Sequence, residues 1–169
     1  MIYVCSLARI ADTVSESGAE RLLSLLAAGT EVVRPTSILA ENHLHLSMHD
    51  IADAQDGMTP PGEDHVRDIL DFAGRWDRRK PMVVHCYAGI SRSTASAYII
   101  AAALAPHRDE FELARKLRDL SPSATPNPRL VALADRMLGR QNRMVEAIRE
   151  IGRGADAYEG TPFVLKIDV

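Results

Sequence analysis

Apolar residues follow two different spacings in this chain, and each spacing predicts a different kind of element. Apolar and polar residues alternate in Leu44–Met48, which predicts a half-buried strand. The apolar run Pro81–Val84, rich in β-branched residues, predicts a buried parallel strand. Two further short strands are expected at Ile2–Leu7 and at Glu31–Val33, the second of which ends before Pro35.

Elsewhere the apolar residues recur every three or four positions, which predicts helices with one buried side. The leucines of Ser15–Ala28 form such a stripe, and Gly29 would end that helix. Asp109 and Glu112 form a capping box at the start of another helix. The helix that this capping box begins is expected to end at Leu120. The remaining helices are expected at Glu63–Arg75, at Thr94–Leu104 and from Arg129 onward, where one long helix would bury Leu130, Leu133, Leu138, Val145 and Ile148.

Strands and helices that alternate in this way predict an α/β fold, with a mostly parallel central sheet that helices flank on both faces. The ligand site of such a fold lies beyond the carboxyl ends of the strands. A chain of 169 residues is long enough for one domain with a full core. We expect residues 1–151 to form that single domain, and residues 152–169 to form a C-terminal tail of uncertain structure.

Composition and charge exclude several classes of function. The hydrophobic content of 46% and the charged content of 25% are typical of a soluble globular protein. A net charge of −3 gives no reason to expect binding to nucleic acid or to an anionic membrane. The pattern predicts neither a signal peptide nor a membrane span. The chain has only two cysteines, Cys5 and Cys86, which fits a reducing, cytoplasmic environment.

The strongest chemical signal is the segment His85–Thr94, which joins the predicted strand at Pro81–Val84 to the predicted helix at Thr94–Leu104. A tight loop between a strand and a helix N-terminus offers backbone N–H groups that converge on an anion, and the helix dipole favours negative charge there. Cys86 begins this loop and Arg92 ends it. The sequence therefore predicts an anion-binding loop with a thiol at its base.

Five residues of this segment have expected chemical roles. Helix N-termini and nearby arginines lower a thiol pKa from about 8.5 to roughly 3.5–7.5, so Cys86 is expected to act as a thiolate nucleophile. Arg92 offers a planar fork to two phosphoryl oxygens, and Gly89 permits a positive φ that turns the loop amides inward. We expect the Ser93 hydroxyl to donate to the Cys86 sulfur, and the His85 ring to bind backbone and orient the cysteine.

The motif His-Cys-x-x-Gly-x-x-Arg-Ser at residues 85–93 resembles the active-site signature of the cysteine-dependent protein tyrosine phosphatases. It is most similar to the small dual-specificity group, which Ala97–Ile100 and Pro126–Pro128 also resemble. The resemblance implies a phosphatase catalytic domain that hydrolyses phosphate monoesters (phosphotyrosine, or with dual specificity) through a phosphocysteine intermediate. It implies neither a metal nor a cofactor. The phosphate oxygens would be held by Arg92 and by the backbone of Tyr87, Ala88, Gly89, Ile90 and Ser91.

The resemblance also implies an aspartate that protonates the leaving oxygen, and three candidates follow the predicted strand Leu44–Met48. Asp50 comes directly after the strand, where the dual-specificity group usually carries this acid, and it is the candidate that we favour. Asp53 and Asp56 are the alternatives. The separation between Asp50 and Cys86 (86 − 50 = 36 residues) is longer than expected, and an insertion at Gly57–Gly62 would account for the difference.

The substrate is expected to be a phosphorylated protein or a small phosphorylated molecule, and no oligomeric state is predicted. The loop carries no lysine, which argues mildly against highly anionic inositol lipids. A competing interpretation is a module that binds a phosphorylated ligand with little turnover, although the presence of Cys86, Arg92 and a candidate acid argues against it. A rhodanese-like sulfur-transfer protein ranks lower, since the loops of such proteins generally have a different spacing to the arginine.

Two weaker patterns have alternative interpretations. His43 and His45 share one strand face, as metal ligands sometimes do, but we favour an exposed polar strand face with no metal site. Cys5 is expected to be a buried free thiol, and a reversible disulfide with Cys86 is the alternative.

Overall fold

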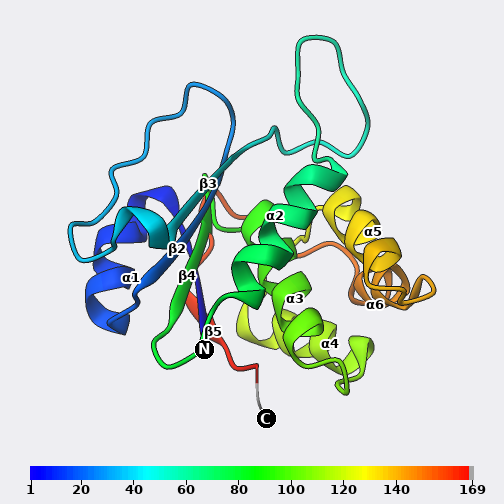
Figure 1. The fold of residues 1–169 in the computed structure, drawn as a ribbon. Coiled ribbons are helices and arrows are strands. Elements are labelled where there is room, and N and C mark those ends of the chain that lie inside the picture. The colour runs from blue at the N-terminus through cyan, green and yellow to red at the C-terminus, as the bar shows by residue number, and fades with distance from the viewer. Residues whose placement is uncertain (168–169) are drawn as a thin grey trace.

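The computed structural model describes residues 1–167, whose five strands form a single sheet (Figure 1). The strand order is β3-β2-β4-β1-β5. Four strands are parallel, and β5 is antiparallel to its neighbour β1. The strands are β1 (Ile2–Ser6), β2 (Arg21–Leu26), β3 (His43–Ser47), β4 (Met82–Cys86) and β5 (Phe163–Leu165).

Helix α1 (Ile10–Ser17) covers one face of the sheet, and the later helices cover the other (Figure 1). The prediction of a mostly parallel sheet with helices on both faces is therefore confirmed. Two short 3₁₀ turns, Leu7–Arg9 and Ala40–Asn42, complete the regular structure of the described residues. The later helices are α2 (Glu63–Gly74), α3 (Arg92–Leu104), α4 (Glu110–Leu120), α5 (Pro128–Met137) and α6 (Arg143–Ile151).

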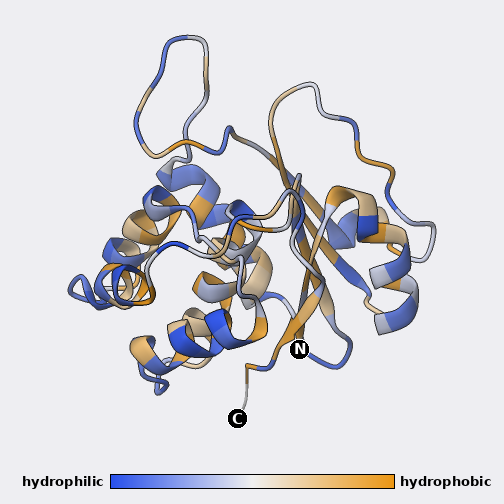
Figure 2. Cartoon of the chain, turned by 180° about the vertical axis from the view of Figure 1, so that it is seen from behind, coloured by the Kyte–Doolittle hydropathy of each residue, from blue (hydrophilic) through white to orange (hydrophobic). Residues whose placement is uncertain are grey.

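Strand β4 and helix α3 lie at the centre of the core. All residues of β4 are buried, and α3 is buried from Arg92 to Ala102. The larger apolar cluster fills the space between the sheet and helices α2–α6, and a smaller one lies beneath α1. The outer helices carry both apolar and polar residues, as expected when a helix buries only one side (Figure 2). The loop between β4 and α3 is therefore held by two elements that cannot shift without exposing the core.

The prediction of a helix at Ser15–Ala28 is wrong. Helix α1 ends at Ser17, Gly18 follows in the left-handed conformation with φ 63°, and the leucine-rich run forms strand β2. The leucines at 22, 23, 25 and 26 lie on both faces of a strand that has a neighbour on each edge. A strand covered on both faces needs no polar side, so its apolar run also satisfies the spacing of a helical stripe.

Two other predicted elements also need correction. No strand forms at Glu31–Val33, where the chain is an irregular loop and the side chain of Val33 is 87% exposed. The single helix predicted from Arg129 is two helices, α5 and α6. Leu130 and Leu133 are buried as expected, whereas Leu138, Val145 and Ile148 are only partly buried.

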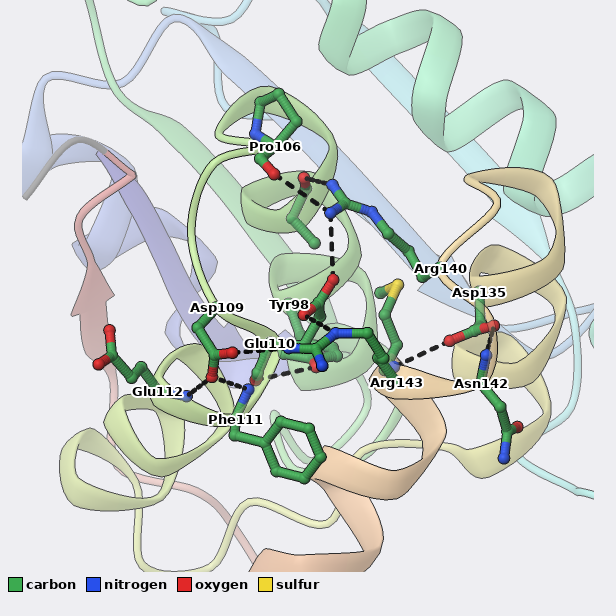
Figure 3. Close-up of polar contacts among 12 residues, drawn as sticks. Tyr98, Pro106, Asp109, Glu110, Phe111, Glu112, Asp135, Arg140, Asn142 and Arg143 are labelled. Carbon is green, nitrogen blue, oxygen red and sulfur yellow. Dashed lines mark hydrogen bonds and ion pairs between the residues drawn. The ribbon is translucent and has the colours of Figure 1, made fainter.

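The turn between α5 and α6 accounts for the second error. Gly139, Gln141 and Asn142 all have positive φ, which no helix can contain. The carboxylate of Asp135 stabilises the turn, because it accepts hydrogen bonds from the backbone N–H groups of Asn142 (2.7 Å) and Met144 (2.8 Å) (Figure 3). The chain therefore reverses direction where the apolar pattern alone predicts continuity.

A network of charged side chains closes the C-terminal end of α3 (Figure 3). Arg140 donates to the carbonyl oxygens of Ala102 (2.7 Å) and Pro106 (3.2 Å), and to Oε1 of the buried Glu110 (3.1 Å). Arg143 donates from Nε to Oε2 of the same carboxylate at 2.8 Å. A cation at this end of a helix also interacts favourably with the helix dipole. The predicted N-cap of the neighbouring α4 is confirmed, since the Asp109 carboxylate accepts from two N–H groups of its first turn.

Candidate active site

The segment Cys86–Arg92, called the cysteine loop below, connects the last residue of β4 to the first residue of α3. It lies at the carboxyl end of the parallel strands, where the sequence predicts the ligand site. Gly89 has φ 73°, and a Cβ there would lie 2.8 Å from the Cys5 carbonyl carbon and the Ser6 nitrogen. Only glycine fits at this position, for both reasons. The close approach to β1 fixes the path of the loop.

Cys86 is 2% exposed and lies at the amino end of α3. Its Sγ is 3.2 Å from Oγ of Ser93, which is also buried. This contact is the one that the sequence predicts between these two residues. A hydroxyl that donates to sulfur and the positive end of a helix dipole both stabilise negative charge that develops on the sulfur.

Arg92 has an unusual set of hydrogen bonds for a buried arginine. Its side chain is 7% exposed, and Nη1 donates to the carbonyl oxygen of Met48 at 2.8 Å. Its Nε is buried and has no hydrogen-bond partner within residues 1–167. Buried donors are nearly always paired, so this guanidinium is positioned to bind an acceptor that is not part of the protein.

Asp50 is the one of the three candidate acids that is bonded to the cysteine loop. Its Oδ1 accepts hydrogen bonds from Oγ of Ser91 (2.7 Å) and from Nδ2 of Asn127 (2.8 Å). Both bonds reach the same oxygen, so Oδ2 is the atom on which a transferable proton would be carried. Asp53 and Asp56 are exposed farther along the loop between β3 and α2. The geometry thus brings Asp50 to the site and leaves the other two in the long loop.

Asn127 is a site residue that the sequence interpretation did not assign. Its Oδ1 caps α5 by accepting from the N–H groups of Arg129 (3.1 Å) and Leu130 (3.0 Å), while its Nδ2 donates to Asp50. Arg129 in turn binds the carbonyl oxygens of Pro61 and Ala52 in the loop that follows Asp50. The Pro126–Pro128 segment was the available signal, but its pattern indicated only the start of a helix.

His85 is fully buried beneath the cysteine loop. Its Nδ1 lies 3.4 Å from the carbonyl oxygen of Cys86, which is a backbone contact of the kind that the sequence predicts. Its Nε2 lies 2.6 Å from Oγ of Ser24. Burial lowers the pKa of His85 from 6.5 to about 4, so the ring is neutral at physiological pH.

The structure shows how the residues of the two weaker patterns lie. The rings of His43 and His45 stack with their centroids 6.2 Å apart, and no cluster of three or more metal-ligating side chains occurs within residues 1–167. In the β1–β4 register Ser6 pairs with Cys86, and Cys5 pairs with His85. Cys5 therefore lies on the opposite face of the sheet from Cys86, and both thiols are free. Burial raises the pKa of the Cys5 thiol to about 11.

The segment after α6 packs against the cysteine loop. The N–H of Gly160 donates to the carbonyl oxygen of Ala88 at 2.8 Å, and Oγ of Ser6 donates to the carboxylate of Glu159. A cleft of about 410 Å³ adjoins the loop at Ser91 and is also lined by Asp50, by Asn127 and by residues 153–157. Residues 153–160 thus form part of the wall around the site. No helix within residues 1–167 is long and apolar enough to cross a lipid bilayer.

Comparisons with known proteins agree with this geometry. A family model described as protein-tyrosine phosphatase matches residues 33–124, which is more than half of the chain. The structure of DUSP15 has a TM-score of 0.62 and 17% sequence identity, over 89% of each chain. The Cydia pomonella PTP-2 phosphatase has a TM-score of 0.61 and 17% identity, over 79% of this chain and 83% of that one. PTPMT1 in complex with PI(5)P has a TM-score of 0.60 and 13% identity, over 89% and 92%. No curated protein matches the chain.

The similar structures show the fold of this chain, and the match to the family model shows the family to which it belongs. Sequence identities this low show a shared fold, whereas the family model covers the strand and loop that carry Cys86 and Arg92. Hydrolysis of phosphate monoesters through a phosphocysteine intermediate is typical of that family. The fold resembles those of small dual-specificity phosphatases, and the chain belongs to the protein-tyrosine phosphatase family of cysteine-dependent, metal-independent enzymes that hydrolyse phosphate monoesters.

Proposed function

We propose that Cys86 is the nucleophile, that Arg92 and the N–H groups of the cysteine loop bind the phosphoryl group, and that Asp50 is the general acid. The observation that carries this assignment is the environment of Arg92. Its guanidinium is buried and tethered to Met48, yet its Nε has no hydrogen-bond partner in residues 1–167. A planar, permanently charged donor of this kind matches two oxygens of one phosphate.

In the proposed first step the Cys86 thiolate attacks phosphorus in line with the leaving oxygen. The phosphorus–sulfur bond forms as the phosphorus–oxygen bond breaks, and Asp50 transfers its proton to the departing oxygen. Arg92 and the backbone of residues 87–91 neutralise the charge on the three equatorial oxygens. The product of this step is phosphocysteine and the dephosphorylated alcohol or phenol.

In the second step water attacks the phosphocysteine. The Asp50 carboxylate takes a proton from this water, and the Cys86 sulfur leaves as a thiolate. The Ser93 hydroxyl, 3.2 Å from Sγ, stabilises the negative charge that returns to sulfur. The hydrogen bonds from Ser91 and Asn127 hold Asp50 in one orientation through both steps. His85 orients the Cys86 carbonyl and stays outside the proton transfers.

The physiological substrate is proposed to be a phosphorylated protein, with phosphotyrosine or dual specificity. A small phosphorylated molecule is the second candidate, because PTPMT1, a structural neighbour, binds PI(5)P. The loop side chains Tyr87, Ala88 and Ile90 offer no cation for a second phosphate, which favours the protein substrate. We also propose that residues 1–151 form the catalytic domain and that the segment after them completes it, because β5 (Phe163–Leu165) pairs with β1 in the same sheet. A cytoplasmic location is proposed from the two free thiols.

The test of this proposal is hydrolysis of p-nitrophenyl phosphate in the presence of a chelator. The wild-type protein should hydrolyse p-nitrophenyl phosphate, and Cys86→Ser should be inactive. Cys5→Ser is the matched control, because it removes the other buried thiol from the opposite face of the sheet and should retain activity. Activity that survives in Cys86→Ser would contradict the proposed nucleophile. Stoichiometric phosphate binding without turnover by the wild type would favour the binding module.

A further inference from the structure

Three polar side chains form a hydrogen-bonded chain through the sheet beneath the cysteine loop. They are His85 on β4, Ser24 on β2 and His43 on the edge strand β3. Nε2 of His85 lies 2.6 Å from Oγ of Ser24, and that oxygen lies 2.8 Å from Nε2 of His43. His85 and Ser24 are fully buried, whereas His43 is partly exposed. These hydrogen-bonded side chains therefore link the backbone of Cys86 to the edge of the sheet.

Only one arrangement of protons satisfies all three contacts. The carbonyl oxygen of Cys86 can only accept, so His85 must carry its proton on Nδ1. Its ring is neutral, because burial lowers its pKa to about 4. Nε2 of His85 is then unprotonated and accepts the single hydroxyl proton of Ser24. The Ser24 oxygen in turn accepts a hydrogen bond from the Nε2–H of His43. The opposite tautomer of His85 would direct a nitrogen lone pair at the Cys86 carbonyl.

The orientation of the Cys86 carbonyl matters for the reaction because a peptide group is planar and trans. When the carbonyl oxygen is held toward His85, the N–H of the same peptide, which belongs to Tyr87, points to the opposite side. His85 and Cys86 are adjacent in β4, so their side chains lie on opposite faces of the sheet. A contact that fixes the Cys86 carbonyl therefore also fixes the direction of the Tyr87 N–H, which belongs to the cysteine loop.

We propose that Ser24 and His43 are positioning residues for the phosphatase reaction, which act by fixing the tautomer and ring orientation of His85. The inference rests on the proposed role of Cys86 as the nucleophile. Neither residue touches the phosphoryl group; their effect reaches it through His85 and the Cys86 peptide. Loss of the Ser24 hydroxyl frees His85 to adopt its other tautomer, which lets the peptide rotate and weakens the field that stabilises the thiolate.

The charge of His43 does not decide the direction of the hydrogen bonds in this chain. Burial, the stacked ring of His45 and the cation of Arg34 all lower the pKa of His43, and His85 faces it across Ser24. An imidazolium at His43 would still donate from Nε2, so the direction of the chain does not depend on the charge of this ring. Ser24 and His43 are thus proposed to orient the His85 ring, and no pH-dependent switch is proposed.

The first test is the imidazole ¹⁵N NMR spectrum of the wild-type protein, with the His85 signals assigned by comparison with His85→Asn. We expect His85 to carry its proton on Nδ1 and to have an unprotonated Nε2 at pH 7. A His85 ring protonated on Nε2 would overturn the proposal. The measurement needs no activity, so its result is separate from the success or failure of the proposed catalytic cycle.

The second test compares variants by the pH dependence of Cys86 alkylation with iodoacetate and of kcat/KM. Ser24→Ala should lower kcat/KM by about 10-fold and move the thiol pKa upward, while Ser24→Thr, which keeps a hydroxyl, should restore both. His43→Phe retains an aromatic ring without a donor and should give a smaller loss, of about 3-fold. The matched control is His45→Phe, which alters the neighbouring ring outside the chain and should behave as the wild type.

These variants distinguish positioning from a merely structural role. If Ser24→Ala unfolds more easily but keeps the wild-type alkylation profile and the wild-type His85 tautomer, the proposal is wrong. Where Ser24→Ala fails to fold, His43→Phe decides, because His43 is partly exposed on an edge strand. If His43→Phe then has both the wild-type thiol pKa and the wild-type kcat/KM, the proposed positioning role of the hydrogen-bonded chain is wrong.

Discussion

An arginine lies at each end of helix α3, Arg92 buried and Arg140 partly buried, and the two arginines are used in opposite ways. At the N-terminal end Arg92 donates to one protein acceptor, the Met48 carbonyl, and its buried Nε has none in residues 1–167. At the C-terminal end Arg140 donates to two carbonyl oxygens and a carboxylate (Figure 3). Arg140 thus stabilises the helix through bonds made within the protein, whereas Arg92 keeps part of its capacity for a ligand.

This difference indicates where the fold gives up stability for function. A buried donor without a partner costs about 1–3 kcal/mol, and a cation beside the positive end of a helix dipole is also unfavourable. Both costs fall on Arg92 until an anion binds there. The network around Arg140 has the reverse arrangement, with a cation at the negative end of the dipole. Changes at the two ends should therefore separate activity from stability.

The largest expected effect is on catalysis, at Arg92. Arg92→Lys keeps the charge but loses the planar fork, and we expect kcat/KM for p-nitrophenyl phosphate to fall by about 10³-fold. The melting temperature should stay equal or rise, since an unpaired buried donor is removed. Steady-state kinetics and thermal denaturation of the same preparation check both parts. If Arg92→Lys instead loses much stability and keeps its activity, the contrast between Arg92 and Arg140 is wrong.

The next effect is expected at Asp50. Asp50→Asn removes the proton donor, so hydrolysis of an alkyl or phenyl phosphate should slow by about 10²-fold. Hydrolysis of p-nitrophenyl phosphate should slow much less, because its leaving group departs without protonation. Asp53→Asn and Asp56→Asn are the matched controls and should leave both rates near the wild type. An equal loss on both substrates in Asp50→Asn would exclude Asp50 as the acid.

At the other end of α3 the expected effect is on stability. Arg140→Met leaves the buried Glu110 with one ionic partner fewer, and we expect a loss of about 3 kcal/mol in the free energy of unfolding. The kcat/KM should change less than about two-fold, because Arg140 lies outside the site. Arg136→Met, which breaks the exposed ion pair with Glu63, should cost less than about 1 kcal/mol. Urea denaturation measures both variants, and similar losses in the two would contradict the role assigned to the network.

The smallest effect concerns the pH dependence of stability. The pKa of His85 is about 4 in the folded protein and about 6.5 when unfolded, so between these values only the unfolded chain binds the proton. Stability contributed by the neutral ring is therefore lost as pH falls, by about 2 kcal/mol from pH 7 to pH 5. His85→Asn should lack this part of the slope in urea denaturation. Identical slopes in the variant and the wild type would show that burial does not hold the ring neutral.

The sequence was sufficient for the centre of the fold and less so for its surroundings. Strand β4, the cysteine loop and helix α3 follow each other directly, so a local motif specified all three. The leucine run of β2 was misassigned because a strand buried on both faces has no polar side to reveal its period of two. The helix break at residues 138–142 was missed because the apolar spacing continues across it, although Gly139, which has φ 65°, is a residue that commonly ends a helix.

The candidate site shows the same division between local and distant information. The contact between Cys86 and Ser93 spans seven residues and could be predicted from the motif. The bond between Asp50 and Asn127 spans 77 residues and depends on how α5 packs beside the loop after β3. The position of Asp50 directly after a predicted strand favoured it as the acid, but this position contained no information about its partners. The packing of residues 153–160 on the loop likewise depends on the antiparallel pairing of β5 with β1.

The hydrogen bond from Gly160 to Ala88 also has a consequence for the order of events during protein synthesis. A ribosome produces the cysteine loop more than seventy residues before Gly160 (160 − 88 = 72), and domains begin to fold while they are still being made. The sheet can assemble from β1 to β4 in that interval, but the loop lacks the support of Gly160 and β5. The wall of the site formed by residues 153–160 can therefore close only after this segment has left the ribosome, so the cysteine loop gains this support later than the rest of the sheet.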